Sequence, residues 1–399
     1  MLVAFEDILD GRSSRAVDRN KAKILGAICG DRPVTRKRLA SRLRIRPTTI
    51  SALVNELIDD GVVVESKSLS PPRQGRPEIL LQAQMTRFAV LVIHVVSHDI
   101  RGALVDMAGN VLAERVAGLN GMETGNKRVI EAIEGLIDDL RDEAPAESQL
   151  LGIGIAVPGI IDPAERRWIF SSRWPKMHDL SFDAIAERTG LTVHVSRNLS
   201  LELRTRMLRR PEERKGGVLF VHWGYGIGSA YSWNGTVLDS SVGSFGELGH
   251  WIVSPDSLQT CFCGETGCLE TEAALWAMLP EIRRSFPEAP ADEWAFERFM
   301  REHRVAELEV MRRAGETFAL SLANLYKAFY PERVVLTGPF ALQERIFDRL
   351  NRTFERHLPF YARDKCQMYA ARPGPMDVIH GSSLPFFQKA LRDLLISHG

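Results

Sequence analysis

Three segments near the N-terminus have apolar residues spaced as on one face of a helix: residues 20–30, 36–43 and 47–61. Gly30 ends the first in the position of a C-terminal cap, Thr35 can cap the second, and Pro47 begins the third, where a first turn tolerates proline. A turn of three residues, 44–46, joins the second segment to the third. This order of helix, tight turn and helix predicts a helix-turn-helix. A plain three-helix bundle would show the same apolar spacing and is the alternative.

Two segments rich in β-branched and apolar residues follow, GVVVES at 61–66 and EILLQ at 78–82. Their pairing would make the helix-turn-helix a winged one, with the Pro- and Gly-containing residues 67–77 as the tip. The tip carries Arg73 and Arg76, which a stiff, extended segment can place in a narrow, electronegative minor groove. A proline-rich interdomain linker is the other interpretation, and the two are compatible because such a linker can order on DNA.

From residue 88 onward, apolar strands alternate with helical segments. Three strands joined by short turns occupy residues 88–116, and helical patterns such as 129–140 precede further strands such as 150–161. This alternation predicts an α/β architecture. Further on, three glycines follow an apolar strand and an Asn-Gly pair makes a two-residue hairpin turn: Gly224, Gly226, Gly228 and Asn234-Gly235.

The length and composition of the chain indicate the compartment in which the protein works. The 399 residues are enough for two or three domains, and 45% apolar and 26% charged residues are ordinary for a soluble protein. No apolar run reaches the roughly 18 residues of a membrane span, and the N-terminus is acidic where a signal peptide would be basic. We therefore expect a cytoplasmic protein with no membrane partner, in which clustered cysteines bind metal more often than they form disulfides.

Charge is distributed unevenly along the chain. Residues 12–87 hold 16 Lys and Arg against 7 Asp and Glu, whereas residues 88–399 hold 35 against 41. A basic head before an acidic body indicates a nucleic-acid contact at one end only, with a solvated basic face as the alternative. Threonine, serine and asparagine side chains at the start of the third helix suit base edges in the major groove. The candidate DNA-binding residues are Arg44, Arg46, Thr48, Thr49, Ser51, Asn55, Arg73 and Arg76.

The order of motifs along nearly the whole chain resembles that of the ROK family of repressors, open reading frames and sugar kinases. The resemblance rests on the helix-turn-helix with its GRP wing, VPGIID, GYGIG, GELGH and CFCGETGCLE. It implies an actin-like fold in which two α/β lobes flank a sugar-binding cleft, and the head is similar to that of xylose and N-acetylglucosamine repressors. The predicted fold class is therefore α/β, a winged helix-turn-helix followed by a two-lobed actin-like body. The expected divisions are 1–17 as an extension, 18–86 as the DNA-binding domain, 87–195 completed by about 380–399 as the first lobe, and 196–379 as the second lobe.

A zinc site is predicted in residues 246–270, which contain three of the five cysteines, a histidine and three glutamates, of which Glu247 and Glu270 bear on the ligand site. Three cysteines and one histidine together close the tetrahedral shell of a structural zinc ion. The C-x-C spacing, with Gly264 and Gly267, lets a tight loop fold back to complete that shell. The predicted ligands are His250, Cys261, Cys263 and Cys268. Reduced cysteines in an ordinary loop are the alternative.

The ROK resemblance also implies a ligand site beside the metal. It assigns Glu247, His250 and Glu270 to the hydroxyls of a sugar, with one histidine nitrogen on the metal and the other on the ligand. A surface salt bridge is the alternative for each glutamate. Arg197 and Asn198 stand where the family has an Asn-Asp pair and complete the expected site. Because a guanidinium prefers carboxylate or phosphate partners, Arg197 suggests an acidic or phosphorylated ligand.

Three departures from the family's kinase motifs indicate a cleft that binds without reacting. The Asp-x-Gly phosphate turn has His94 and Val96 instead, and a side chain blocks the approach that glycine permits. Asn198 replaces the catalytic Asp, and an amide cannot accept a proton at neutral pH. Thr337-Gly338 replaces a Gly-Gly pair. We therefore expect no enzyme activity and neither ATP nor Mg²⁺, and we interpret GYGIG as inherited hairpin architecture.

These observations predict a ROK transcriptional regulator, in the first place a repressor. We expect it to bind double-stranded operator DNA as a homodimer or a dimer of dimers and to respond to a sugar or sugar-derived effector. Zinc is the expected cofactor, in a structural role. Two rival hypotheses stay open: an active ATP-dependent sugar kinase with an added DNA-binding head, and a scaffold that binds a partner protein through its body.

Overall fold

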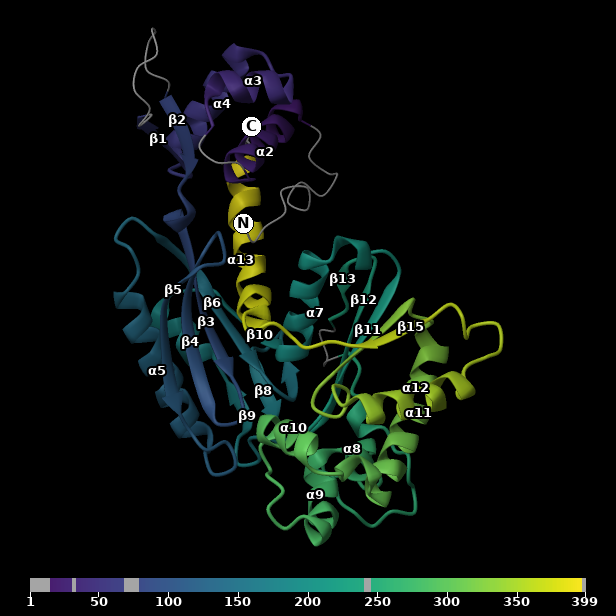
Figure 1. The fold of residues 1–399 in the computed structure, drawn as a ribbon. Coiled ribbons are helices and arrows are strands. Elements are labelled where there is room, and N and C mark those ends of the chain that lie inside the picture. The colour runs from purple at the N-terminus through teal and green to yellow at the C-terminus, as the bar shows by residue number, and fades with distance from the viewer. Residues whose placement is uncertain (1–14, 31–33, 68–78, 240–244, 397–399) are drawn as a thin grey trace.

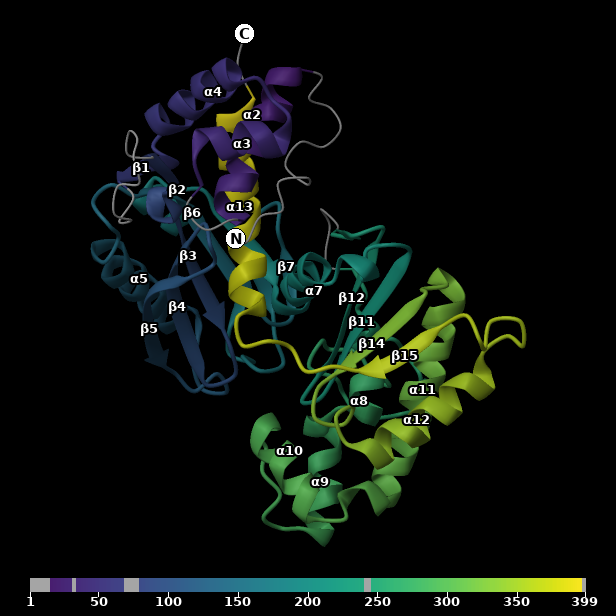
Figure 2. The same cartoon turned by 45° about the horizontal axis from the view of Figure 1, so that its top comes forward.

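A small helical head stands above a body of two lobes in the computed structural model, and one long helix runs from the body into the head (Figures 1 and 2). The structure describes residues 15–30, 34–67, 79–239 and 245–396. Each lobe is built on a five-stranded sheet. The predicted order of a winged helix-turn-helix and a two-lobed α/β body is confirmed.

Three helices and a strand pair form the head. They are α2 (Ala16–Gly30), α3 (Arg36–Leu43), α4 (Pro47–Asp59), β1 (Val63–Lys67) and β2 (Ile79–Ala83). Thr35 caps α3, because its Oγ1 accepts a hydrogen bond from the backbone N–H of Arg38 at 3.3 Å. Pro47 lies in the first turn of α4, and the strands pair antiparallel as predicted. The predicted wing tip, with Arg73 and Arg76, lies outside the described residues.

The head shares its hydrophobic core with the first lobe. Buried residues of the head, of the lobe's sheet and of the last helix, α13 (Asp377–Leu395), form one cluster, with Phe387 of α13 fully buried in it. The buried ammonium group of Lys21 in α2 joins the two parts. It donates to the carbonyl of Leu394 at 3.2 Å and to Oδ2 of Asp60 at 2.9 Å. The head therefore packs directly against the first lobe.

The first lobe is a sheet covered by a helix on each face. Its strands, in spatial order, are β10 (Val193–Arg197), β6 (Gln149–Val157), β3 (Phe88–Val95), β4 (Asp99–Asp106) and β5 (Val111–Gly118). Helix α5 (Asn126–Asp142) packs on one face and α13 on the other. A small sheet and a short helix extend the lobe: β7 (Ile160–Asp162), β8 (Arg167–Phe170), β9 (His178–Ser181) and α6 (Asp183–Thr189).

Alternation along β3 explains why its sequence is an unbroken apolar run. Successive side chains of a strand point to opposite faces of the sheet. Leu91 and Ile93 lie in the cluster under α5, whereas Val90 and Val92 lie in the cluster shared with α13 and the head. Both faces are buried, so both sets of positions must be apolar.

The second lobe repeats this plan. Its strands, in spatial order, are β13 (Thr236–Val237), β12 (Ile227–Trp233), β11 (Gly217–Trp223), β14 (Arg333–Thr337) and β15 (Gln367–Ala370). Helix α7 (Asn198–Arg209) packs on one face. The other face carries α8 (Leu269–Ala273), α9 (Leu275–Ser285), α10 (Glu293–Glu302), α11 (Glu309–Phe329) and α12 (Glu344–His357).

The predicted Asn234-Gly235 turn is confirmed, with positive φ at both residues. Within the described ranges, no helix combines the length and the apolar character needed to cross a membrane.

Helix α13 begins at the cavity between the lobes and ends in the head. Val378 lines that cavity, whereas Leu395 is buried in the core shared with the head. Pro385 has no N–H, so it leaves the carbonyl of Gly381 without its partner in the helix. Nη1 of Arg204, on α7, donates to this carbonyl at 3.3 Å. A side chain of the neighbouring helix thus replaces the hydrogen-bond donor that α13 lacks at Pro385.

Candidate metal centre and ligand cleft

A cavity of about 480 Å³ lies between the two lobes, and this volume is within the range of small-molecule sites. Both lobes contribute to its wall. The residues that the sequence analysis selected for ligand binding, or as substitutions in the kinase motifs, line it: His94, Val96, Arg197, Asn198, Glu247, His250, Glu270 and Thr337.

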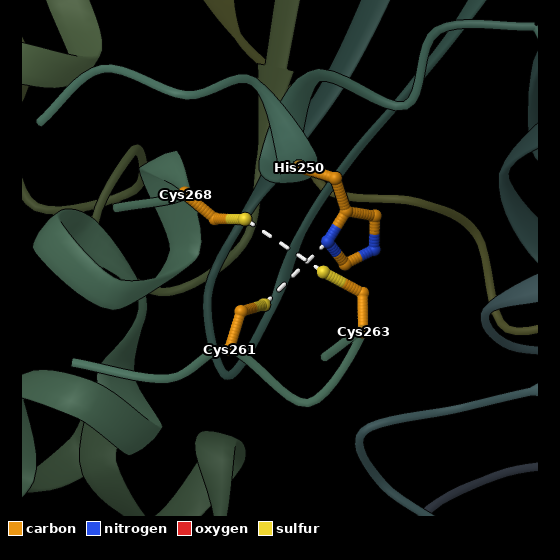
Figure 3. Close-up of side chains that lie close together, drawn as sticks. All are labelled: His250, Cys261, Cys263 and Cys268. Carbon is orange, nitrogen blue, oxygen red and sulfur yellow. Dashed lines mark hydrogen bonds between the residues drawn. The ribbon is translucent and has the colours of Figure 1, made fainter. Parts of the chain in front are cut away.

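The four predicted zinc ligands lie close together (Figure 3), and one of them, His250, lines the cavity. The donor atoms of His250, Cys261, Cys263 and Cys268 lie within 4.8 Å of one another. Sγ of Cys261 is 3.6 Å from Nδ1 of His250, and Sγ of Cys263 is 3.7 Å from Sγ of Cys268. Zinc bonds of about 2.0–2.3 Å give a tetrahedron with edges of about 3.6 Å between S and N and about 3.8 Å between two S atoms. The cluster therefore has the dimensions of a zinc site.

The chemistry of the donors agrees with this geometry. Burial raises the pKa of the Cys268 thiol to about 11, so this sulfur needs a cation beside it to become a thiolate ligand. Zinc would supply that charge and tie the loop together, and four protein ligands leave no open position for catalysis.

Two glycines allow the metal loop to fold back. Gly264 and Gly267 have φ of 97° and 70°, which residues with a side chain rarely adopt. A Cβ on Gly267 would lie 2.0 Å from the carbonyl oxygen of Ser254. The backbone N–H of Cys261 then donates to the carbonyl of Glu265 at 2.7 Å and closes the turn. The loop can therefore present its cysteines to one point.

His250 joins the metal cluster to the cavity. Its Nδ1 faces the sulfurs, and the other ring nitrogen points away from them (Figure 3), with Nε2 4.0 Å from Oε2 of Glu247. Glu270 is buried at the start of α8 and accepts hydrogen bonds from the N–H of Ile227 at 2.8 Å and from Nε1 of Trp276 at 3.2 Å. Its carboxylate is fixed in the cavity wall and forms no salt bridge with the residues that the structure describes.

Arg197 has its partners within the chain. Nη1 lies 3.1 Å from Oε1 of Glu247, and Nη2 donates to the carbonyls of Ser229, at 2.8 Å, and Phe245. Only 7% of the Arg197 side chain is exposed. The carboxylate that was expected from an acidic ligand is thus supplied by Glu247, which removes the reason for expecting such a ligand.

Asn198 and Glu202 lie on successive turns of α7 and line the cavity. Nδ2 of Asn198 donates to the carbonyl of Val95 at 3.2 Å. Oδ1 of Asn198 and Oε2 of Glu202 are buried, and neither has a hydrogen-bond partner in the described part of the chain. Burial raises the pKa of Glu202 from 4.5 to about 7. These two groups are acceptors that a hydrogen-bond donor of a ligand would satisfy.

His94 and Val96 end β3 at the cavity. Burial, with a smaller contribution from the charge of Arg101, lowers the pKa of His94 to about 4, so the ring is neutral at pH 7. The carbonyl of Val96 accepts a hydrogen bond from Nε1 of Trp174 at 2.8 Å, which fixes this turn to the first lobe. A neutral imidazole therefore lines the cavity at the end of β3.

Sequence reasoning missed several polar residues of the cavity, among them Arg173, Glu202, His222 and Glu293. Glu202 had a signal, because it follows Asn198 by four residues and so shares its face of the helix. The other three come from separate segments and meet only in the folded chain. Glu293, the first residue of α10, is only 4% exposed.

The candidate DNA-binding residues of the head lie on the surface around the start of α4. Arg44, Arg46, Thr48, Ser51 and Asn55 are exposed, and Thr49 is half-buried. Oδ1 of Asn55 accepts a hydrogen bond from Nη2 of Arg36 at 2.9 Å, and Arg36 also forms an ion pair with Glu65. Arg36 therefore joins this surface as a residue that the sequence analysis did not select.

Comparison with known proteins gives consistent matches for both parts of the chain. The ROK family matches residues 90–383, and the winged helix-turn-helix DNA-binding family matches residues 17–64. The xylose repressor of Caldicellulosiruptor bescii is 25% identical over 336 residues, which are 79% of this chain and 82% of that protein. The DNA-binding transcriptional dual regulator NagC of Escherichia coli is 23% identical over 339 residues, 82% of each chain. A crystal structure of a ROK family transcriptional regulator, a homologue of the E. coli Mlc protein, shares the fold with a TM-score of 0.69 at 20% identity, covering 95% of this chain and 97% of that one.

Proposed function

The chain belongs to the ROK family, and on this premise we propose that it is a transcriptional repressor that binds operator DNA through its head and a sugar or sugar-derived effector through its cleft. The observation that carries the proposal is a winged helix-turn-helix packed on a body that contains a ligand-sized cavity. The similarity to proteins named xylose repressor and NagC supports the same function.

On the DNA side, the first turn of α4 would enter the major groove. Thr48 and Ser51 are exposed there and reach base edges, while Arg44 and Arg46 contact phosphates in the preceding turn. We assign Arg73 and Arg76 of the wing to the minor groove. A homodimer or a dimer of dimers would place two heads on half-sites a helical turn or more apart.

On the effector side, the charges of the cavity favour a ligand that donates hydrogen bonds. Six carboxylates and three guanidinium groups line it: Asp99, Glu202, Glu247, Glu270, Asp292 and Glu293, with Arg101, Arg173 and Arg197. This excess of acidic groups repels phosphates and carboxylates, and it offers acceptors to the hydroxyl or amino groups of a sugar. We therefore propose an uncharged or amino sugar, held by Glu247, His250, Glu270 and Asn198, with Arg197 positioning Glu247. Zinc at the cluster of His250 and the three cysteines would hold His250 in place.

We further propose that the cleft does not phosphorylate its ligand. Asn198 stands at the position of the catalytic base in the family's kinases, and its Nδ2 is committed to the carbonyl of Val95. The amide cannot take a proton from a sugar hydroxyl, and loss of a positioned base typically costs about 10²–10⁴-fold in rate. Ligand binding would instead shift the equilibrium between lobe arrangements, in proportion to its differential affinity for them.

A DNA-binding measurement tests this function. Fluorescence anisotropy of a labelled duplex from the chain's own genomic neighbourhood should show a preference over competitor DNA, and the preference should change with one class of sugar. Equal binding to both duplexes with every sugar would contradict the proposal.

Two further experiments test the rival functions. Turnover at ordinary enzyme rates in a coupled ADP-release assay, lost in Asn198→Ala, would favour the kinase. Sugar-independent capture of a partner protein would favour the scaffold.

A further inference from the structure

The turn between β11 and β12 is occupied by a carboxylate of the chain itself. Oε2 of Glu293 accepts a hydrogen bond from the backbone N–H of Tyr225 at 3.2 Å and forms an ion pair with Arg173. Oε1 of Glu293 lies 2.9 Å from Nε2 of His222. A backbone amide and a guanidinium thus donate to one buried carboxylate, and an imidazole lies beside it. Amide and guanidinium donors are what proteins use to hold an oxyanion.

The backbone is shaped to let this carboxylate approach closely. A Cβ on Gly224 would lie 2.5 Å from Oε1 of Glu293 and 2.6 Å from Nε2 of His222. A side chain at this position would displace the carboxylate or the imidazole, so glycine lets the two groups approach the backbone in the way that glycines let a backbone approach a bound phosphate. The GYGIG turn is accordingly more than hairpin architecture, because it forms one wall of an anion site.

Electrostatics keep the group ionised in this place. Burial would raise the pKa of the Glu293 carboxyl, but the charges of His222 and Arg173 and their hydrogen bonds outweigh burial and hold the pKa far below its usual range. Only 4% of the side chain is exposed. The carboxylate therefore behaves as a bound anion, paired on several sides and withdrawn from solvent.

The contact also joins the two lobes. Arg173 follows β8 in the first lobe, where its guanidinium also bonds Oγ of Ser97 after β3. Its Cζ lies 5.1 Å from the ring centroid of Tyr225 in the second lobe. Glu293 begins α10, also in the second lobe. An anion in this position is therefore held by side chains of both lobes at once.

We propose that Arg173, His222 and the Gly224–Gly226 turn form an oxyanion site whose resident ligand is the Glu293 carboxylate, so that a compact external oxyanion binds only when this side chain is removed. The chain thereby closes the half of the cleft nearest Glu293 to phosphate groups. Under the proposed function, the effector is then bound by the part of the cavity that Glu247 and Glu270 line.

Glu293→Ala tests the proposal, with inorganic phosphate and acetate as probes. The variant leaves Arg173 without its carboxylate and opens space beside the turn. Its melting temperature should rise saturably, by about 3 °C, when phosphate or acetate replaces chloride at constant ionic strength. The wild-type protein should shift by less than about 1 °C under the same conditions. The second variant, Arg173→Ala/Glu293→Ala, should lose the response because the cation is gone.

Asp292→Asn is the matched control, since it removes one negative charge at the adjacent residue and asparagine still caps α10. It should respond like the wild type. Recovery of folded Glu293→Ala only from phosphate or acetate buffer would support the proposal in the same way. A wild-type or Asp292→Asn response equal to that of Glu293→Ala, a folded Glu293→Ala without a response, or failure to fold in every buffer would overturn it. None of these results depends on DNA binding, so the proposed repressor function is tested separately.

Discussion

Nη1 of Arg197 and Oε1 of Glu247 lie 3.1 Å apart in the wall of the cleft. Arg197 is the last residue of β10, and Glu247 directly precedes the short helical turn that carries His250, a predicted zinc ligand. The ion pair therefore links the first lobe's sheet to the metal loop. It also neutralises the cation that would otherwise attract an acidic ligand.

Removal of this guanidinium should destabilise the protein. Arg197→Met leaves Glu247 without its cation and two carbonyls, those of Ser229 and Phe245, without a donor. We expect a loss of about 2–3 kcal/mol in the free energy of unfolding, because hydrogen bonds to charged groups contribute more than neutral ones. Urea unfolding measures it. Arg167→Ala breaks an ion pair with exposed partners and should cost less than about 1 kcal/mol. Equal losses in the two variants would refute the structural role of Arg197.

Stability should depend on the ionisation of Glu202. Its pKa in the folded protein is raised from 4.5 to about 7 by burial, with Asp377 and Glu293 adding to the shift and His222 opposing it. Between these two pH values the unfolded chain releases a proton that the folded chain keeps, so this group makes the folded state less stable as pH rises.

Glu202→Gln should remove that dependence. The free energy of unfolding of the wild type should fall between pH 5 and pH 7.5 by about 1–2 kcal/mol more than that of the variant. Urea midpoints at the two pH values give the comparison. Glu131→Gln, a substitution on α5, is the control and should behave as the wild type does. A parallel pH profile for wild type and Glu202→Gln would show that Glu202 does not carry the effect.

Metal should be present in the purified protein at one zinc ion per chain. Cys263→Ser removes one of four ligands, and a chelator removes the ion, so either should lower the melting temperature by about 5 °C or more. Elemental analysis and thermal unfolding measure the two effects. Cys366→Ser, outside the cluster, should keep its zinc. A wild-type chain without metal, or a Cys263→Ser variant with full zinc content, would exclude the assigned ligand set.

DNA affinity should depend on the arginines before α4. Arg46→Ala should weaken operator binding about tenfold, and the slope of log affinity against log salt should fall by about 1, because one phosphate contact is lost. Anisotropy titrations at several salt concentrations measure both quantities. Lys127→Ala removes an equally exposed cation from the body and should change neither. The same loss in both variants would indicate a nonspecific charge effect.

Features whose determinants are close in sequence were predictable. The bounds of α3 were predicted to the residue, because Thr35 marks its start and the short turn marks its end. The metal cluster was predictable because its ligands span only residues 250–268 and zinc imposes a donor set. The pairing of β1 with β2 followed from two adjacent segments rich in β-branched and apolar residues.

Contacts between distant segments were not predictable from pattern. Glu293 meets Arg173 across 120 positions of the chain, and no periodicity or motif marks either residue. The partner of Arg197 was likewise hidden, because the choice between Glu247 and a ligand is decided by how the lobes pack. The uneven distribution of charge along the sequence also does not predict that the head packs against α13.

The 19 residues of α13 make a rod of about 28 Å with one end in the pocket wall and the other under the reading head. Tilting such a rod by about 5° at its base swings the tip by about 2.5 Å, close to the length of a hydrogen bond. Under the proposed repressor function, an effector that tilts the base of α13 by this amount would shift the head relative to its DNA half-site. The displacement would pass along one continuous helix, in which Arg204 replaces the donor that Pro385 lacks.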